Sequence, residues 1–204
     1  RPELVLMAYD NPNGANNFRY KIGWNLDAQG VAANWTDHAQ VAGVGWEGQG
    51  AAVVIGQIDA NPRPDMIFIA YDNPSGANTF RYRVGLNVNT AGNATWAANF
   101  VDVAGVGWEG QGLGAALWNL DGNPRPDLVL MAYDNPTGAN TFRYRVGSNL
   151  DANGVAQTWQ PGSQTLPGMG AEGQGAGLAL SCIDANPGTD WVVMSYDNPA
   201  GANS

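Results

Sequence analysis

Two kinds of hydrophobic pattern alternate along the chain in a fixed order. Short runs that are almost entirely apolar occupy residues 4–8, 66–70, 128–132 and 191–195, and such runs are typical of strands buried on both faces. Each of the first three is followed by a run that alternates apolar residues (Phe, Tyr and Ile or Val) with basic ones, at 18–22, 80–84 and 142–146. This period of two predicts a strand with one packed face and one solvated face.

A turn motif joins the two runs and occurs four times, at 8–16, 70–78, 132–140 and 195–203. Its tyrosine is residue 9, 71, 133 and 196, so the motif returns every 62 or 63 residues. Asp-Asn-Pro followed by Gly favours a tight turn, because Pro fixes φ and Gly permits positive φ. Each copy therefore predicts a β-hairpin, and the period predicts an array of repeats.

Two further strands complete each repeat. Small residues dominate 51–55, 114–118 and 177–180, which suits an inner strand where neighbouring sheets crowd together. A polar, variable segment surrounds Trp35, Trp96 and Trp159 and suits an outer strand. The gradient from small to buried to solvated predicts an all-β fold, a β-propeller built of tandem four-stranded blades of 62 residues.

The repeats occupy residues 1–62, 63–124 and 125–187, and a partial fourth occupies 188–204. A propeller needs about four blades or more to close. We therefore expect a single repeat array that forms a homo-oligomer or belongs to a longer propeller chain.

The composition argues against two classes of function, nucleic-acid binding and membrane insertion. The net charge is −9, from 18 acidic and 9 basic residues, which argues against nucleic acid, and no apolar run approaches the length of a membrane span, so membrane insertion is not expected. Sequons at Asn34 and Asn93 favour a secreted protein. Cys182 is the only cysteine and lies in the apolar, strand-like run 178–183, which predicts a buried, inert thiol, with an intermolecular disulfide as the alternative.

An Asp/Asn-rich loop precedes the apolar strand of three repeats, at 58–65, 120–127 and 183–190. These loops resemble those of FG-GAP or VCBS repeats, which form the blades of integrin heads and of fungal propeller lectins. The resemblance implies calcium, bound through oxygens at alternate positions. The implied ligands are Asp59, Asn61, Asp65, Asp121, Asn123, Asp127, Asp184, Asn186 and Asp190.

The chain departs from that family pattern. The first ligand position of the family falls on Gln57, Asn119 and Cys182, and the turn glycine of the family falls on a proline in each loop. Because proline cannot adopt positive φ, an Asx-capped turn without metal remains the alternative. The Asp10 and Glu47 equivalents are another possible place for calcium.

Topology predicts a second site. In an up-and-down blade, the loop that enters the first strand and the loop after the second strand lie on the same rim. Aromatic, carboxylate and amide side chains on such a rim suit sugar recognition, because an aromatic face stacks on a pyranose and the polar groups bind its hydroxyls. The candidates are Asp10, Asn11, Asn16, Trp46, Glu47, Gln49, Asp72, Asn73, Asn78, Trp108, Glu109, Gln111, Asp134, Asn135 and Asn140. A purely structural role for these repeated residues is the alternative.

Catalysis is not expected. His38 is the only histidine and has no counterpart in the other repeats, and no Ser/His/Asp arrangement or phosphate loop is present. A carboxylate pair from Glu47 and Asp72 is conceivable, but identical chemistry in every repeat is unusual for an enzyme. We therefore expect a multivalent lectin that binds glycans or glycoproteins, with galactose or N-acetylated sugars implied by the resemblance. The alternative is a structural or protein-interaction propeller of the integrin type.

Overall fold

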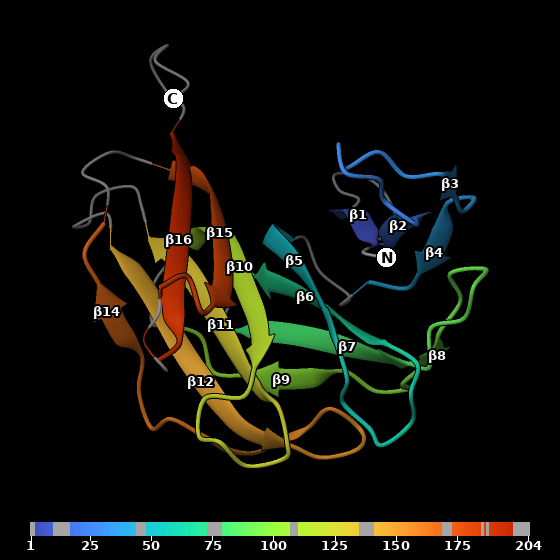
Figure 1. Cartoon of the computed structure of the whole chain (residues 1–204). Helices are drawn as coiled ribbons and strands as arrows, with labels where there is room; N and C mark the ends of the chain where they lie inside the picture. Colours follow the sequence, from blue (N-terminus) through green and yellow to red (C-terminus); the bar gives the residue numbers. More distant parts are fainter. Residues whose placement is uncertain are drawn as a thin grey trace.

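The computed structural model describes residues 3–9, 17–43, 48–72, 79–106, 110–134, 141–168, 173–184, 186 and 188–197. These residues form four antiparallel sheets and no helix. In Figure 1 the sheets follow one another along an arc, with the first sheet (blue) and the fourth sheet (red) at its two ends. The all-β prediction is confirmed, and the sheets do not close into a ring within the described residues.

The second and third sheets contain the same five strands in the same order, whereas the first sheet begins with the apolar second strand and the fourth contains only the inner and second strands among the described residues. The first sheet contains β1 (Leu4–Tyr9), β2 (Phe18–Trp24), β3 (Asn34–Trp35) and β4 (Ala39–Val41). The second contains β5 (Gly48–Gly56), β6 (Asp65–Asp72), β7 (Phe80–Leu86), β8 (Thr95–Trp96) and β9 (Val101–Val103). The third contains β10 (Gly110–Trp118), β11 (Asp127–Asp134), β12 (Phe142–Leu150), β13 (Ala156–Trp159) and β14 (Gln164–Leu166), and the fourth contains β15 (Gly173–Ser181) and β16 (Asp190–Asp197).

The outer strand of each full sheet differs from the single strand that the sequence predicts. It consists of two short pieces, and in the second sheet β8 pairs with one end of β7 while β9 pairs with the other. Between these pieces, the Arg83 side chain donates from Nε to the Ala97 carbonyl at 2.9 Å. A side chain therefore replaces part of the backbone ladder at this point.

The apolar second strand is covered on both faces in the two middle sheets, as predicted. Residues 66–71 of β6 and 128–133 of β11 are all at most 1% exposed. One face of β6 packs on the preceding sheet, where the rings of Phe68 and Phe18 lie 5.3 Å apart. The other face, which includes Ile69, packs on Leu130 of the following sheet. In β1 and β16, by contrast, every second residue is exposed.

The inner strands lie close together, which explains their small residues. A Cβ atom added to Gly112 of β10 would lie 2.5 Å from the backbone nitrogen of Ala176 in β15. A Cβ on Gly50 of β5 would lie 2.8 Å from the backbone nitrogen of Leu113 in β10. Both distances are too short for any side chain, so the prediction of a crowded inner strand is confirmed.

Two predictions about solvent exposure were wrong. Arg145 of β12 is buried rather than solvated, because it donates to the Ala104 carbonyl of the preceding sheet at 2.8 Å. Cys182 is exposed rather than buried. The reason is that β15 ends at Ser181, so the cysteine begins a turn, as do the exposed residues Gln57 and Asn119 at the same repeat position.

Candidate functional site

The backbone pairs the ends of two strands next to the predicted loops in the second, third and fourth sheets. Gly48, at the start of β5, pairs with Asp72, at the end of β6, and Gly50 pairs with Tyr71. Gln49 is therefore the extra residue of a β-bulge. The same bulge occurs in the third and fourth sheets, where Gly110 pairs with Asp134 and Gly173 with Asp197. The start of the inner strand and the end of the second strand thus share one edge, which we call the rim.

The side chains of the predicted rim site lie outside the described residues. Gln49, Asp72, Gln111 and Asp134 are described in their backbone alone. The rest of the set lies wholly outside the described part of the chain: Asp10, Asn11, Asn16, Trp46, Glu47, Asn73, Asn78, Trp108, Glu109, Asn135 and Asn140. The structure therefore gives the pairing of the strand ends at the rim, and sugar binding by the rim side chains stays a prediction.

The Asp/Asn loops lie at the opposite edge and are fully described in the second and third sheets. The Asp65 side chain is 0% exposed. Its Oδ2 accepts the backbone N–H of Ile58 at 2.8 Å and that of Asp59 at 3.3 Å, and its Oδ1 accepts the N–H of Asn87 at 2.8 Å. One carboxylate therefore ties the loop to the turn after β7, where Asn87 adopts a positive φ of 61°.

The third sheet repeats this arrangement. Asp127, 1% exposed, accepts from Leu120 at 2.7 Å and from Asn149 at 2.9 Å. In the fourth sheet, Asp190 accepts the backbone N–H of Ile183 at 2.6 Å. The last aspartate of each predicted ligand set is thus a cap for backbone amides.

The other predicted ligands form local turns. Asp59 accepts from the backbone N–H of Asn61 at 2.9 Å and from the side-chain amide of the same residue. Asn61 in turn accepts the N–H of Arg63 at 2.8 Å. The same pattern joins Asp121 to Asn123, and Asp184 to Asn186. These are Asx turns, in which a side-chain oxygen takes the place of a backbone acceptor.

The described hydrogen bonds account for these oxygens without a metal ion. Calcium takes six to eight oxygen ligands, and each predicted carboxylate here accepts at least one backbone N–H group. Among the described residues, no group of three His, Cys, Asp or Glu side chains is placed to hold a metal ion. The loops match the Asx-capped alternative, and calcium at these residues stays an expectation from the resemblance.

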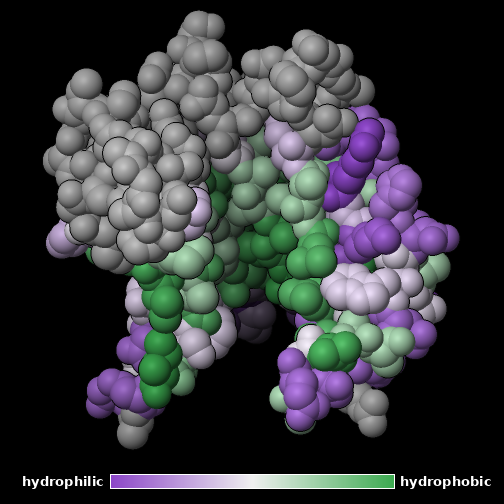
Figure 2. Space-filling view, turned by 90° about the horizontal axis from the view of Figure 1, so that it is seen from above, coloured by the Kyte–Doolittle hydropathy of each residue, from purple (hydrophilic) through white to green (hydrophobic). Residues whose placement is uncertain are grey.

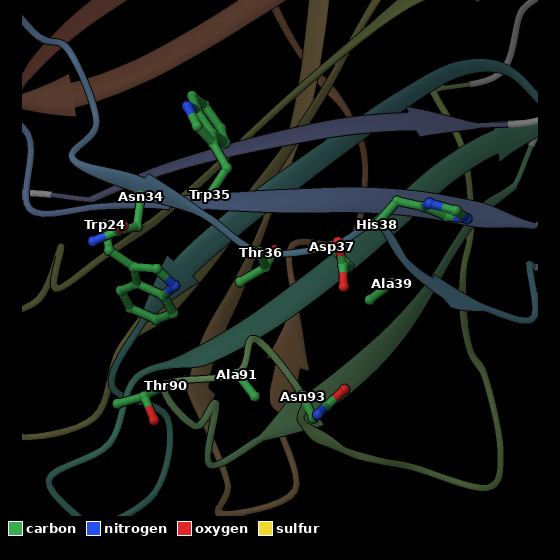
Figure 3. A pocket seen from close by; sticks show the side chains of 10 residues that line it. All are labelled: Trp24, Asn34, Trp35, Thr36, Asp37, His38, Ala39, Thr90, Ala91 and Asn93. Atoms are coloured by element: carbon green, nitrogen blue, oxygen red, sulfur yellow. The ribbon is translucent and has the colours of Figure 1, made fainter.

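A groove of about 500 Å³ lies between the first and second sheets and was not predicted. In Figure 3 Trp24 points toward the turn residues Thr90 and Ala91 of the second sheet, and Asp37 points to the same side as Asn93. Trp35 points the other way. The sequence carried one signal for this groove, because the residues that match Trp24 in the second and third repeats are leucine and serine.

Two other single residues lie at this surface. His38 is exposed and lines the groove, and Figure 3 shows its ring turned away from Asn93. Asn34 and Asn93, the two sequon asparagines, are both exposed and line the same groove from neighbouring sheets. Both positions are therefore sterically accessible to a glycosylating enzyme.

Tyrosines join the first sheet to the second and the second to the third at the edge of the Asp/Asn loops. The Tyr20 hydroxyl donates to the Gly92 carbonyl at 2.8 Å, and the Tyr82 hydroxyl donates to the Gly154 carbonyl at 2.9 Å. Burial raises the pKa of both phenols above the ordinary value. The neutral phenol is thus the form that the fold stabilises.

Comparisons with protein families, with characterised proteins and with solved structures found no match. No helix among the described residues has the length and apolar character needed to cross a membrane.

Proposed function

We propose that the chain is a secreted, non-catalytic, multivalent carbohydrate-binding protein with the architecture of a β-propeller. One observation carries the proposal: the strand register pairs Gly48 with Asp72 and Gly110 with Asp134, and in the sequence these residues belong to the Gly-Trp-Glu-Gly-Gln loop and the Tyr-Asp-Asn-Pro turn. Indole, carboxylate and amide groups at one place suit a pyranose, because the indole stacks on its apolar face and the polar groups bind its hydroxyls.

The surrounding structure supports binding in two ways. Backbone pairing and a β-bulge hold the strand ends at the rim, and a site built on fixed strand ends loses less entropy when a ligand binds. Repetition of the rim places several weak sites on one body, so clustered glycans bind with avidity. The ligands are glycans or glycoproteins, and galactose or N-acetylated sugars follow from the resemblance alone.

A structural or protein-interaction propeller is the second candidate. The observation that favours it is the hydrogen-bonding of Asp65 and Asp127, which accounts for the Asp/Asn loops by folding alone. If the rim turns serve folding in the same way, the repeats only build blades. This candidate predicts a folded protein that binds no glycan.

A glycan array probed with and without a calcium chelator separates the two candidates. The proposal predicts binding to a defined terminal sugar. Loss of binding on chelation would place calcium at the rim, and binding that persists would remove calcium from the account. No binding under either condition, by protein with native circular dichroism, would contradict the proposal and favour the interaction scaffold.

A pair of variants tests the location of the site. Replacing both Trp46 and Trp108 by alanine removes the proposed stacking faces and should reduce the affinity of each site for the sugar several-fold, as expected for stacking groups that contribute roughly 0.5–1.5 kcal/mol each. The matched control is Asp37→Ala, which alters the groove between the first and second sheets. A sugar affinity lost in Asp37→Ala and kept in the double tryptophan variant would move the site to that groove.

A further inference from the structure

Large apolar side chains are exposed on the outward face of the first sheet. Leu4, Leu6 and Trp35 are 38%, 52% and 44% exposed. We call these three residues the first-sheet face. The middle sheets bury the same repeat positions: the counterparts of Leu6 are Phe68 and Leu130, both 0% exposed. In the middle sheets, this face is always covered by the preceding sheet.

Trp35 follows the same rule. It pairs with a glycine of β2, as Trp96 pairs with a glycine of β7. The Trp96 ring lies 4.9 Å from Phe68 and 6.2 Å from Tyr20 of the preceding sheet, where it is partly buried. Trp35 is therefore a residue at a packing position that no sheet among the described residues covers.

The fourth sheet exposes the opposite kind of face. Val192, Met194 and Tyr196 of β16 are 47%, 58% and 48% exposed, and we call them the fourth-sheet face. Their counterparts in β6 and β11 are 0% exposed and point toward the following sheet. Figure 2, which views the molecule from above, shows hydrophobic side chains on two walls that face each other across an open gap.

All three junctions within the chain join these two kinds of face. The first meets the second, the second meets the third and the third meets the fourth sheet through the same repeat positions. The fourth-sheet face and the first-sheet face are thus the two halves of one more such junction. The geometry points to a second copy of this chain as the partner, with the fourth sheet of each copy docked on the first sheet of the other.

Polar groups at the first-sheet face agree with that partner. Arg83 donates to the Ala42 carbonyl of the preceding sheet at 3.2 Å, and Arg145 makes the equivalent bond across the next junction. The first sheet has Lys21 at this position, and Lys21 is exposed. In the middle sheets an arginine at this position donates a hydrogen bond to the preceding sheet. The first-sheet face has a lysine at the same position, so it offers a hydrogen-bond donor as well as apolar side chains.

One glycine in a turn of each of the first three sheets also indicates that the first-sheet face is an uncovered packing surface. A Cβ on Gly154 would lie 2.8 Å from Val84, and a Cβ on Gly92 would lie 3.0 Å from Thr36, each in the preceding sheet. The corresponding Gly30 of the first sheet has no atom within 4 Å of such a Cβ. Two copies are the favoured number, because four sheets from each copy reach the upper limit of about eight blades for this architecture and three copies exceed it.

The test is the molar mass of the full 204-residue chain in solution. Light scattering at micromolar concentration, with reductant present to exclude a Cys182 disulfide, should give the mass of a dimer. Leu6→Asp and Met194→Asp should each give monomers, since each removes one half of both junctions. Because both side chains are already exposed in the single chain, the circular dichroism spectrum of each monomer should match that of the parent chain.

Mixing the two variants gives the sharpest result. The intact fourth-sheet face of Leu6→Asp can dock on the intact first-sheet face of Met194→Asp, so an equimolar mixture should form a heterodimer through one junction. The control Val155→Asp, an exposed position in a turn of the third sheet, should stay dimeric. A monomeric parent chain, a dimer that survives either single variant, or a mixture that stays monomeric would overturn the proposal. None of these outcomes depends on sugar binding.

Discussion

Replacing Asp65 by asparagine tests whether the Asp/Asn loop is held by its buried carboxylate. This side chain is 0% exposed and accepts three backbone N–H groups, two at 2.8 Å and one at 3.3 Å. Asparagine has nearly the same shape but one acceptor oxygen, and its NH₂ group would face an N–H donor. The substitution therefore removes at least one short hydrogen bond and leaves its donor buried.

The expected loss is about 2–4 kcal/mol in the free energy of unfolding. A hydrogen bond to a charged acceptor contributes roughly 1.5–3 kcal/mol, and a buried donor without a partner costs roughly 1–3 kcal/mol. The measurement is urea unfolding followed by circular dichroism. Asp190→Asn is the matched control: Asp190 caps the equivalent loop in the fourth sheet but is only partly buried, so its loss should be about 1 kcal/mol or less, because solvent can satisfy the freed amides.

The same experiment separates a capping role from a calcium role. A cap predicts equal destabilisation of Asp65→Asn in calcium and in chelator, and a parent chain whose stability does not change with calcium. A parent chain that calcium stabilises, with the gain lost in Asp65→Asn, would refute the capping argument and restore the calcium site. A loss below about 1 kcal/mol in both buffers would show that the hydrogen bonds do not contribute as their geometry indicates.

Three further predictions concern packing and pH. Tyr82→Phe removes one hydrogen bond between sheets and should lower the free energy of unfolding by about 1 kcal/mol. Since burial raises the pKa of Tyr82 above 10.0, the parent chain should lose stability as the pH rises above 10.0. Unfolding measured across that pH range should show a smaller loss in the variant. Leu130→Ala should cost about 2–5 kcal/mol and Leu6→Ala, in the monomer at low concentration, less than about 0.5 kcal/mol; equal costs would contradict the assigned burial. Gly112→Ala places a methyl group against the backbone of β15 and should cost about 1–3 kcal/mol, whereas Gly188→Ala, which meets no atom within 4 Å, should be nearly neutral in the same urea assay.

Much of the fold followed from the sequence because hydrophobic periodicity is a local signal. The strands and the turns between them depend on residues within about ten positions of one another, which is the range of such patterns. The repeat period follows from the return of the same turn motif every 62 or 63 residues. The crowded inner strand was predictable too, because small residues at a fixed repeat position indicate close approach of the backbone.

Burial in the outer sheets was not predictable, because it depends on neighbours distant in the sequence. Residues 4–8 and 128–132 have the same five letters, Leu-Val-Leu-Met-Ala. Every residue of the second copy is 0% exposed, whereas Leu6 is 52% exposed. The local pattern is the same in both, and the difference arises from whether another sheet packs against that face.

The candidate sites divide in the same way. The shared edge of the two rim loops followed from up-and-down topology and agrees with the strand register. The role of Asp65 could not be predicted from the sequence, since an Asp-x-Asn-Pro loop has the same residues whether its oxygens bind a cation or accept backbone N–H groups. The second amide partner, Asn87, is 22 residues away in the sequence and belongs to a different turn, so only the folded chain reveals the cap.

Isothermal titration with the monosaccharide that the array selects tests the central claim most directly. Two repeats carry the complete Gly-Trp-Glu-Gly-Gln loop, and the third has Ala171 in place of tryptophan. The account therefore predicts two sites of similar affinity per chain and loss of one site in Trp46→Ala. One site that both tryptophan variants leave intact, or no heat of binding from folded protein, would contradict a repeated carbohydrate site on the rim.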